Sequence, residues 1–240
     1  MRRIILATAI FILLVIPLII NAQRKVPNLP DYDLRRFHFG FCLGINHANF
    51  TIKPKSNLNP FDSLLIVSPS GMAGFDIGIV TNMNLGRFFD LRFIPSLSLI
   101  DRKVNYTLKY HNSSINTSTQ NIESVNLNFP LLIKFKSSRV GSNLRFYVIS
   151  GAQYSVDLAT RSKKRTTGSG TQMNIKLYAS DLQAQVGVGV DFYLEYFKFS
   201  IETKMSYGTL NLLKNENNIY TNSVLNLRSK TFHISFLFEG

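Results

Sequence analysis

The chain has 240 residues, of which 45% are hydrophobic and 12% aromatic, and its formal net charge is +13. This hydrophobic content excludes a disordered chain, and the sequence lacks the repeated apolar runs of about 20 residues that a multi-helix membrane protein needs. Only 17% of the residues are charged, against roughly 25% in soluble domains. The single cysteine, Cys42, excludes an intramolecular disulfide and a cysteine-based metal site.

Basic residues exceed acidic ones by 27 to 14, which raises the question of a nucleic-acid partner. The basic residues are spread thinly, with one cluster in residues 161–165, and no helix-turn-helix, zinc-finger or RNA-recognition motif is present. We therefore predict no nucleic-acid partner, and we expect the positive charge to face anionic lipid or protein.

The N-terminus has the layout of a secretory signal peptide. Arg2 and Arg3 precede an apolar run over residues 4–20, and Ala22 follows it closely. We predict a signal peptide over residues 1–22 that is cleaved after Ala22. An uncleaved anchor helix is the alternative, since the run is at the short end of a membrane span, but Pro17 and Ala22 favour cleavage.

A short polar segment, residues 23–36, separates this signal from the first strand. It contains Pro27 and Pro30 and is predicted to be an extended periplasmic leader. Its basic residues make it a candidate docking segment for a periplasmic partner; they are Arg24, Lys25, Arg35 and Arg36. A disordered leader is the alternative.

From residue 37 onward the sequence alternates with a period of two, which is the spacing of a β-strand. In the first run, aromatic residues alternate with His38 and Gly40. Eight such runs are found, at residues 37–46, 73–85, 89–99, 125–136, 145–157, 182–194, 197–207 and 232–239. Pro95 and Pro130 fall inside two of them, where a missing N–H group indicates a bulge or a strand end.

The polar face of these strands is rich in Gly, Asn, Ser and Gln. An eight-stranded barrel is only wide enough for side chains to fill its interior, so small inward residues would make room there for charged ones while the apolar face meets lipid. The glycines expected to make this room are Gly40, Gly44, Gly74, Gly78, Gly187 and Gly189. We predict a buried ion network in the lumen formed by Asp90, Arg92, Asp191, Glu202 and Lys204, because unpaired buried charges are costly.

The connections between the runs alternate between long and short. Long gaps lie at residues 51–72, 101–123, 159–181 and 209–230, and short gaps lie at 85–88, 137–143 and 194–196. The long loops therefore gather at one end, as in outer-membrane barrels, which have short periplasmic turns and both termini in the periplasm. We predict an all-β fold, an eight-stranded antiparallel up-and-down transmembrane β-barrel over residues 37–240, closed so that no strand edge faces lipid.

Catalysis has little support in the sequence. The four histidines are scattered, with no HExxH or comparable metal spacing, and no GxSxG motif is present. His47 with Asn49 and His111 with Ser113 are the best placed candidates, and both pairs are interpreted as loop or lumen residues. We predict no enzyme activity, no metal and no cofactor.

Several segments together resemble the PorT family of outer-membrane barrels of the Bacteroidetes. They are the entry segment at residues 28–41, FDLRFIPSLSL at 89–99, NFPLLIKFKSSR at 128–139, VGVGVDFYLEYFKFSIETKMSYG at 186–208 and YTNSVLNLRSKTFHISFLFE at 220–239. The likeness covers nearly the whole mature chain in order. It implies a component of the type IX secretion system, which exports large folded cargo such as proteases and adhesins and supports gliding motility; it implies no catalytic residues.

The resulting hypothesis is a non-enzymatic part of a secretion machine, whose partners are outer-membrane lipid and other secretion proteins. A lumen this narrow cannot pass folded protein, so contacts would be made through the lipid face, the outer loops and residues 23–36. A generic small outer-membrane barrel with a structural or narrow-pore role is the alternative.

Overall fold

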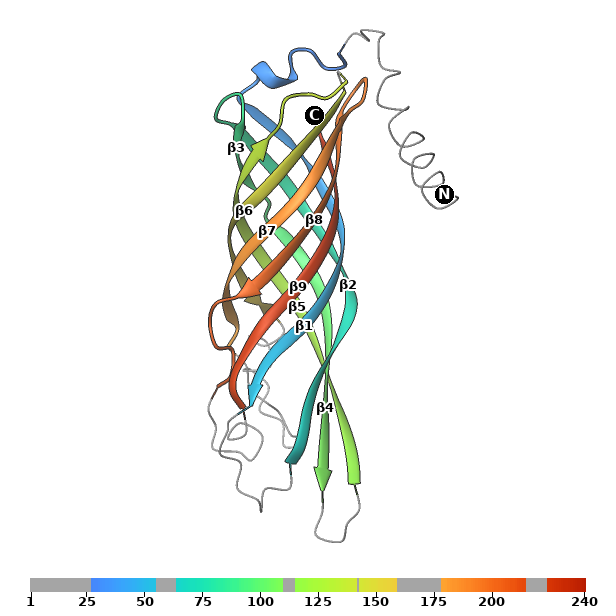
Figure 1. Cartoon of the computed structure of the whole chain (residues 1–240), viewed down its shortest axis with the longest axis vertical. Helices are drawn as coiled ribbons and strands as arrows, with labels where there is room; N and C mark the ends of the chain where they lie inside the picture. The colour runs from blue at the N-terminus through green and yellow to red at the C-terminus, as the bar shows by residue number, and fades with distance from the viewer. Residues whose placement is uncertain (1–26, 55–63, 110–114, 142, 159–177, 215–223) are drawn as a thin grey trace, which may run out of the picture.

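The computed structural model describes residues 27–54, 64–109, 115–141, 143–158, 178–214 and 224–240 (Figure 1). The predicted signal peptide, Arg24 and Lys25 lie outside these ranges. The elements within them are η2 (Tyr32–Leu34), β1 (Phe37–Pro54), β2 (Leu64–Asn84), β3 (Phe89–Phe93), β4 (Ser96–Lys109), β5 (Ile115–Lys136), β6 (Leu144–Asp157), β7 (Ser180–Tyr193), β8 (Lys198–Gly208) and β9 (Val224–Glu239). Among these described residues, no helix is long and apolar enough to cross a membrane.

The strands form one closed antiparallel sheet. Strands that follow one another in the chain pair, except that β3 and β4 each pair with both β2 and β5 and not with each other. The last strand, β9, returns to pair with β1 from Gly40↔Glu239 onward, and β1 also pairs with β2. Closure leaves no unpaired edge around the wall that meets lipid, which is the requirement for a sheet in hydrocarbon. The predicted all-β antiparallel barrel is confirmed.

Strands β3 and β4 are two parts of a single barrel strand. Their register against β5 is continuous, from Phe93↔Leu131 to Ser96↔Asn128, and so is their register against β2. The interruption falls at Ile94 and Pro95, opposite Pro130. Each proline lacks one N–H group, so the ladder loses a donor on either side of this strand without any shift of register. Counting β3 and β4 as one strand gives the predicted eight.

The barrel is apolar outside and polar inside. On the outer surface Phe39 is 62% exposed and Phe75 67% exposed, whereas Arg92 and Glu202 in the lumen are fully buried. The same alternation repeats on β7 and β8, as the period of two predicts. The side chains that face outward therefore present a continuous apolar belt to the bilayer.

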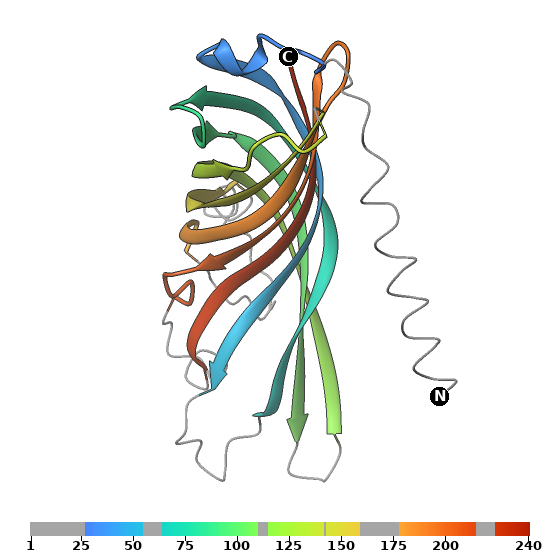
Figure 2. The same ribbon diagram turned by 45° about the horizontal axis from the view of Figure 1, so that its top comes forward.

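The two ends of the barrel differ. One end, which we call the turn end, carries the short connections from β2 to β3, from β5 to β6 and from β7 to β8 (Figures 1 and 2). The short helix η2 and Gly240 also lie at this end. At the opposite end, two of the predicted long loops are mostly strand. Pairing of β1 with β2 stops at Ala48↔Met72, but β2 continues to pair with β4 up to Leu64↔Leu108.

The result is a three-stranded extension of β2, β4 and β5 that projects beyond the rest of the barrel (Figure 1). The gaps at 51–72 and 101–123 were therefore predicted too long. In the second gap, Ser, Thr and Asn in residues 115–124 give the sequence a loop-like composition, although the backbone there pairs with β4. The gap at 209–230 was also predicted too long, because β9 begins at Val224, and only residues 215–223 of it lie outside the described residues. The gap at 159–181 falls largely outside the described residues.

Candidate functional site

The lumen near the turn end holds a network of buried ion pairs centred on Arg92. This arginine, on β3, donates from Nη1 to Glu202 Oε2 over 2.9 Å and from Nη2 to Glu239 Oε1 over 3.0 Å. Lys198 Nζ lies 2.9 Å from the other oxygen of Glu239. Three strands, β3, β8 and β9, are thereby joined across the interior.

Two further pairs extend this network. Lys134 on β5 lies 2.7 Å from Asp191 on β7, which also accepts a 2.6 Å hydrogen bond from Ser200. Lys136, one step nearer the turn end, lies 2.6 Å from Asp90. Each carboxylate thus has a cationic partner from another strand, as groups removed from water require.

Tyr147 on β6 packs in the middle of these charges. Its hydroxyl donates a 3.0 Å hydrogen bond to Glu202, and its ring centre lies 3.7 Å from Lys134 Nζ and 5.4 Å from Arg92 Cζ. An aromatic ring attracts cations through the charge distribution of its face. Tyr147 therefore contacts both cations and the carboxylate of Glu202 inside the lumen.

The structure places all of the predicted network residues, Asp90, Arg92, Asp191, Glu202 and Lys204, on the inner face and buried. Lys204 is the most loosely joined, with Nζ 3.5 Å from Glu202 Oε1. The network also includes residues that the prediction left out: Lys134, Lys136, Tyr147, Lys198 and Glu239. The period of two places these residues on the inner face too. Aligning neighbouring strands from their short turns would have shown that they lie beside the predicted network residues.

The inward glycines do more than make room for charges. A Cβ atom on Gly189 would collide with the ring of Tyr147, and one on Gly187 would lie 2.7 Å from Lys204 Cβ. At Gly40 and Gly74 the nearest atom would be a backbone oxygen of the neighbouring strand, as it also is at Gly187, where Thr203 O would lie 2.6 Å away. Gly40 and Gly74 were expected to make room for charged side chains. The structure shows instead that they permit the close approach of neighbouring backbones in a narrow barrel.

Beyond the ion network the lumen becomes apolar and then polar again. Buried side chains of Cys42, Val80, Ile94 and Leu237 form one cluster, and Leu132 packs with Tyr147 and Ile149 in another. Further on, His233 Nδ1 lies 2.7 Å from Asp76, which also accepts a 2.8 Å hydrogen bond from Asn46. The described part of the lumen is filled by side chains at each of these levels.

The described residues offer no obvious centre for catalysis or metal binding. Among them, no three His, Cys, Asp or Glu side chains come together as a metal would need. His47 is exposed, and the side-chain oxygen of Asn49 accepts a hydrogen bond from the next backbone N–H group, of Phe50. His111 and Ser113 lie outside the described residues.

The described part of the leader, residues 27–36, folds across the turn end instead of being extended. Tyr32 enters the mouth, where its ring stacks on His38 at 3.8 Å and meets the edge of Tyr193 at 5.8 Å. The Tyr32 hydroxyl donates to Glu239, and Lys198 Nζ lies 4.7 Å from the ring centre. We call residues 27–36 the cap. An extended leader was predicted from Pro27, Pro30 and the charged residues, and these contacts with distant strands are what fold it.

Asp33 fastens the cap to the barrel rim. Arg145 donates to both of its carboxylate oxygens, at 2.9 and 3.1 Å, and Arg139 Nη2 lies 3.0 Å from Oδ2. Partial burial raises the pKa of Asp33, but the hydrogen bond and charge of Arg145 and the charge of Arg139 outweigh it and hold that pKa below its ordinary value. Arg139 also donates to the backbone oxygens of Asn28 and Leu29.

Comparison with known proteins identifies the family of this barrel. A family described as "Outer membrane protein beta-barrel domain" matches residues 21–214. The chain belongs to this family. Membership places the protein in the outer membrane. No curated protein matches the chain.

Three solved structures to which the chain is similar come from two bacteria. The outer membrane protein OprG from Pseudomonas aeruginosa has a TM-score of 0.44 and 10% identity, covering 90% of this chain and 98% of its own. The N-terminal β-barrel domain of OprF from the same organism has a TM-score of 0.33 and 12% identity, covering 82% and 96%. The attachment invasion locus protein Ail of Yersinia pestis has a TM-score of 0.36 and 10% identity, covering 86% and 100%.

Proposed function

We propose that this outer-membrane barrel is a non-enzymatic component of the type IX secretion system, of the PorT type. In this role it is needed for the export of signal-bearing cargo such as proteases and adhesins, and it contributes to gliding motility. The resemblance of five segments, in order along the mature chain, supports the assignment. The turn end would then face the periplasm, with the cap exposed to periplasmic partners.

The filled lumen is the observation that carries the mechanism. Arg92, Tyr147 and Glu202 occupy its width near the turn end, and the cap lies over them. Folded cargo has no route through such an interior. The barrel would therefore act through its surfaces, as an accessory or assembly factor for components that do conduct cargo.

The cap offers one of these surfaces. Arg35 and Arg36 are exposed at its end, directly before β1. Neither forms an ion pair with any residue in the described part of the chain, and cations of this kind suit an acidic partner and steer its approach. The predicted docking residues Arg24 and Lys25 would extend the same surface toward the N-terminus.

A deletion of the gene in its native host tests the proposal. Loss of export of cargo carrying the type IX signal, restored by the wild-type gene, is the expected result. Complementation with R35E/R36E should restore an intact barrel in the outer membrane but not export, whereas K53Q/K230Q, which removes two exposed lysines elsewhere, should restore both.

The alternative is a generic small barrel with a structural or narrow-pore role, which family membership alone would also fit. Normal export combined with altered outer-membrane permeability in the deletion strain would favour it over the secretion role. Planar bilayers provide a second test. The purified barrel should form no large, stable channels, and finding them would contradict a filled lumen.

A further inference from the structure

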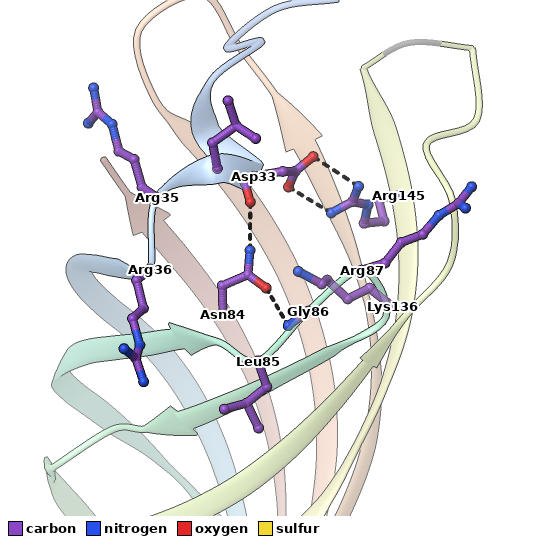
Figure 3. A pocket seen from close by; sticks show the side chains of 10 residues that line it. Asp33, Arg35, Arg36, Asn84, Leu85, Gly86, Arg87, Lys136 and Arg145 are labelled. Atoms are coloured by element: carbon purple, nitrogen blue, oxygen red, sulfur yellow. Dashed lines mark hydrogen bonds and ion pairs between the residues drawn. The ribbon is translucent and has the colours of Figure 1, made fainter.

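A positively charged cleft lies at the turn end, between the cap and the turn that joins β2 to β3 (Figure 3). Its volume is ≈ 620 Å³. The charged residues that line it are Asp33, Arg35, Arg36, Arg87, Lys136 and Arg145. Five cations thus line the cleft with a single carboxylate, and the side chains of Arg35, Arg36 and Arg87 extend away from its centre (Figure 3).

Most of this positive charge is left without a carboxylate. Asp33 is engaged by Arg145 and Arg139, and Lys136 is paired with Asp90. Among the described residues, no carboxylate forms an ion pair with Arg35, Arg36 or Arg87. The cleft therefore has an excess of guanidinium groups, which bind phosphate through paired N–H groups better than a lysine does.

The walls of the cleft are fixed by Asn84. Its backbone N–H donates to Arg36 O over 2.8 Å, and its side chain donates to Asp33 O over 2.7 Å. Its side-chain oxygen accepts a 2.9 Å hydrogen bond from the N–H of Gly86, which has a positive φ of 150°. Cap and turn are thereby held in place before any ligand arrives, which lowers the ordering cost of binding.

The rim of the cleft continues the lipid-facing surface of the barrel. Phe37 is 50% exposed and Phe88 is 40% exposed. Leu85, in the turn that joins β2 to β3, is exposed as well. Arg36 Cζ lies 6.0 Å from the ring centre of Phe37, and Arg87 Cζ lies 5.2 Å from that of Phe88. Aromatic and arginine side chains paired in this way are typical of the headgroup level of a bilayer.

We infer that this cleft binds the phosphate group of an anionic phospholipid from the leaflet that meets the turn end. Arg36 on the cap and Arg87 on the turn reach the phosphate by rotation of their side chains, and the acyl chains lie against Phe37, Leu85 and Phe88. An acidic peptide would match the charge but would leave these apolar side chains without a partner. The inference does not require the secretion role, because any barrel in the outer membrane meets such a leaflet. Arg36 is shared with the docking surface proposed above, whereas Arg87 belongs to the lipid site alone.

Native mass spectrometry of the purified barrel in detergent tests the inference, with phosphatidylglycerol and phosphatidylcholine as the probes. The wild type should retain phosphatidylglycerol in preference to phosphatidylcholine. R36Q/R87Q should bind phosphatidylglycerol at least roughly tenfold more weakly than the wild type does. K53Q/K230Q removes the same charge far from the cleft and should bind as the wild type does. If R36Q/R87Q does not fold, as judged by circular dichroism, R35Q/R87Q replaces it.

Four results would overturn the inference. The wild type could show no preference between the lipids, or K53Q/K230Q could lose phosphatidylglycerol as much as the cleft variant does. Inorganic phosphate at the lipid's own concentration could displace all of the bound lipid, which would identify a site for free phosphate. A polyglutamate peptide could bind more tightly than the lipid, which would identify a site for an acidic protein.

Discussion

The hydroxyl group of Tyr32 lies 3.3 Å from Glu239 Oε2, so the cap is bonded directly to the ion network of the lumen. Glu239 is at the end of β9 and pairs in register with Gly40 of β1, at the seam that closes the barrel. It also accepts from Arg92 and Lys198. One carboxylate therefore links the cap, the network and the seam.

Substitutions at Tyr32 should separate the two kinds of contact that hold the cap. Tyr32→Phe removes the hydrogen bond to Glu239 and should weaken docking of the cap by about 1–3 kcal/mol. Tyr32→Ala also removes the stack on His38 and should weaken it further. Hydrogen exchange of the amides of residues 27–36 measures the docking free energy. Equal exchange in Tyr32→Ala and wild type would show that Tyr32 does not hold the cap.

Docking of the cap should depend on pH through Asp33. Because its pKa in the folded protein is lowered, its ion pairs stabilise the docked cap above the ordinary carboxyl pKa of about 4. That contribution is lost as the pH falls below this value. Limited proteolysis of the cap across a pH series should show increasing cleavage toward low pH, using an acid-active protease.

Asp33→Asn should remove this dependence. The variant should show at neutral pH the cleavage that the wild type shows only in acid, since Arg145 and Arg139 lose the charge they bind. Asp31→Asn is the matched control, because Asp31 is exposed and forms no ion pair among the described residues. A pH dependence that persists in Asp33→Asn would assign it to another group.

Removal of Arg92 should destabilise the whole barrel. Arg92→Met leaves Glu202 and Glu239 short of a buried partner, and breaking such a pair costs about 3–5 kcal/mol. Urea unfolding in lipid vesicles gives the free energy of unfolding. Adding Glu202→Gln should recover part of the loss, because the unpaired charge disappears with it.

Lys230→Gln, at an exposed position, serves as the control for Arg92→Met and should change stability by less than about 0.5 kcal/mol. A loss of similar size in both variants would mean that the ion pairs of the lumen contribute no more than surface charge does.

A pair of glycines tests the space that Tyr147 needs. Gly189→Ala places a Cβ atom against the Tyr147 ring and should destabilise the barrel by about 1–3 kcal/mol. At Gly44 the nearest atoms would be 3.2–3.3 Å away, so Gly44→Ala should cost less. Unfolding midpoints of the two variants, compared at equal lipid content, provide the measurement. The reverse order of stability would contradict the packing of Tyr147.

Strand parity explains why so much of the barrel is predictable from sequence. In a narrow barrel every second residue faces lipid, so Phe39, Phe75 and the inward Asp191 can be assigned from alternation alone. Tyr147 and Ile149 were missed because an aromatic or aliphatic residue in an apolar run resembles a lipid-facing one. Tyr147 lies between Phe146 and Val148, and Ile149 lies between Val148 and Ser150; because these flanking residues are exposed, alternation gives the correct parity.

The cap could not be predicted in the same way. Residues 27–36 have no repeating pattern, and their conformation depends on Asn84, Arg139 and Arg145, which lie far away in sequence. The cationic cleft was missed for the same reason, since Arg36 and Arg87 come together only through the fold. The basic residues of the leader were nevertheless recognised, and the structure places Arg35 and Arg36 on the surface.

The place of Glu239 has a consequence for biosynthesis. During export β9 emerges after the other strands, so Arg92 and Lys198 are already present in the chain when their shared carboxylate is still missing. A barrel intermediate without β9 would leave Arg92 with Glu202 as its one carboxylate and Lys198 without its ion pair, so the open groove would carry excess positive charge and would remain hydrated. Glu239 neutralises that groove when β9 pairs with β1 and closes the barrel, so the interior loses water in the same step in which the wall is completed.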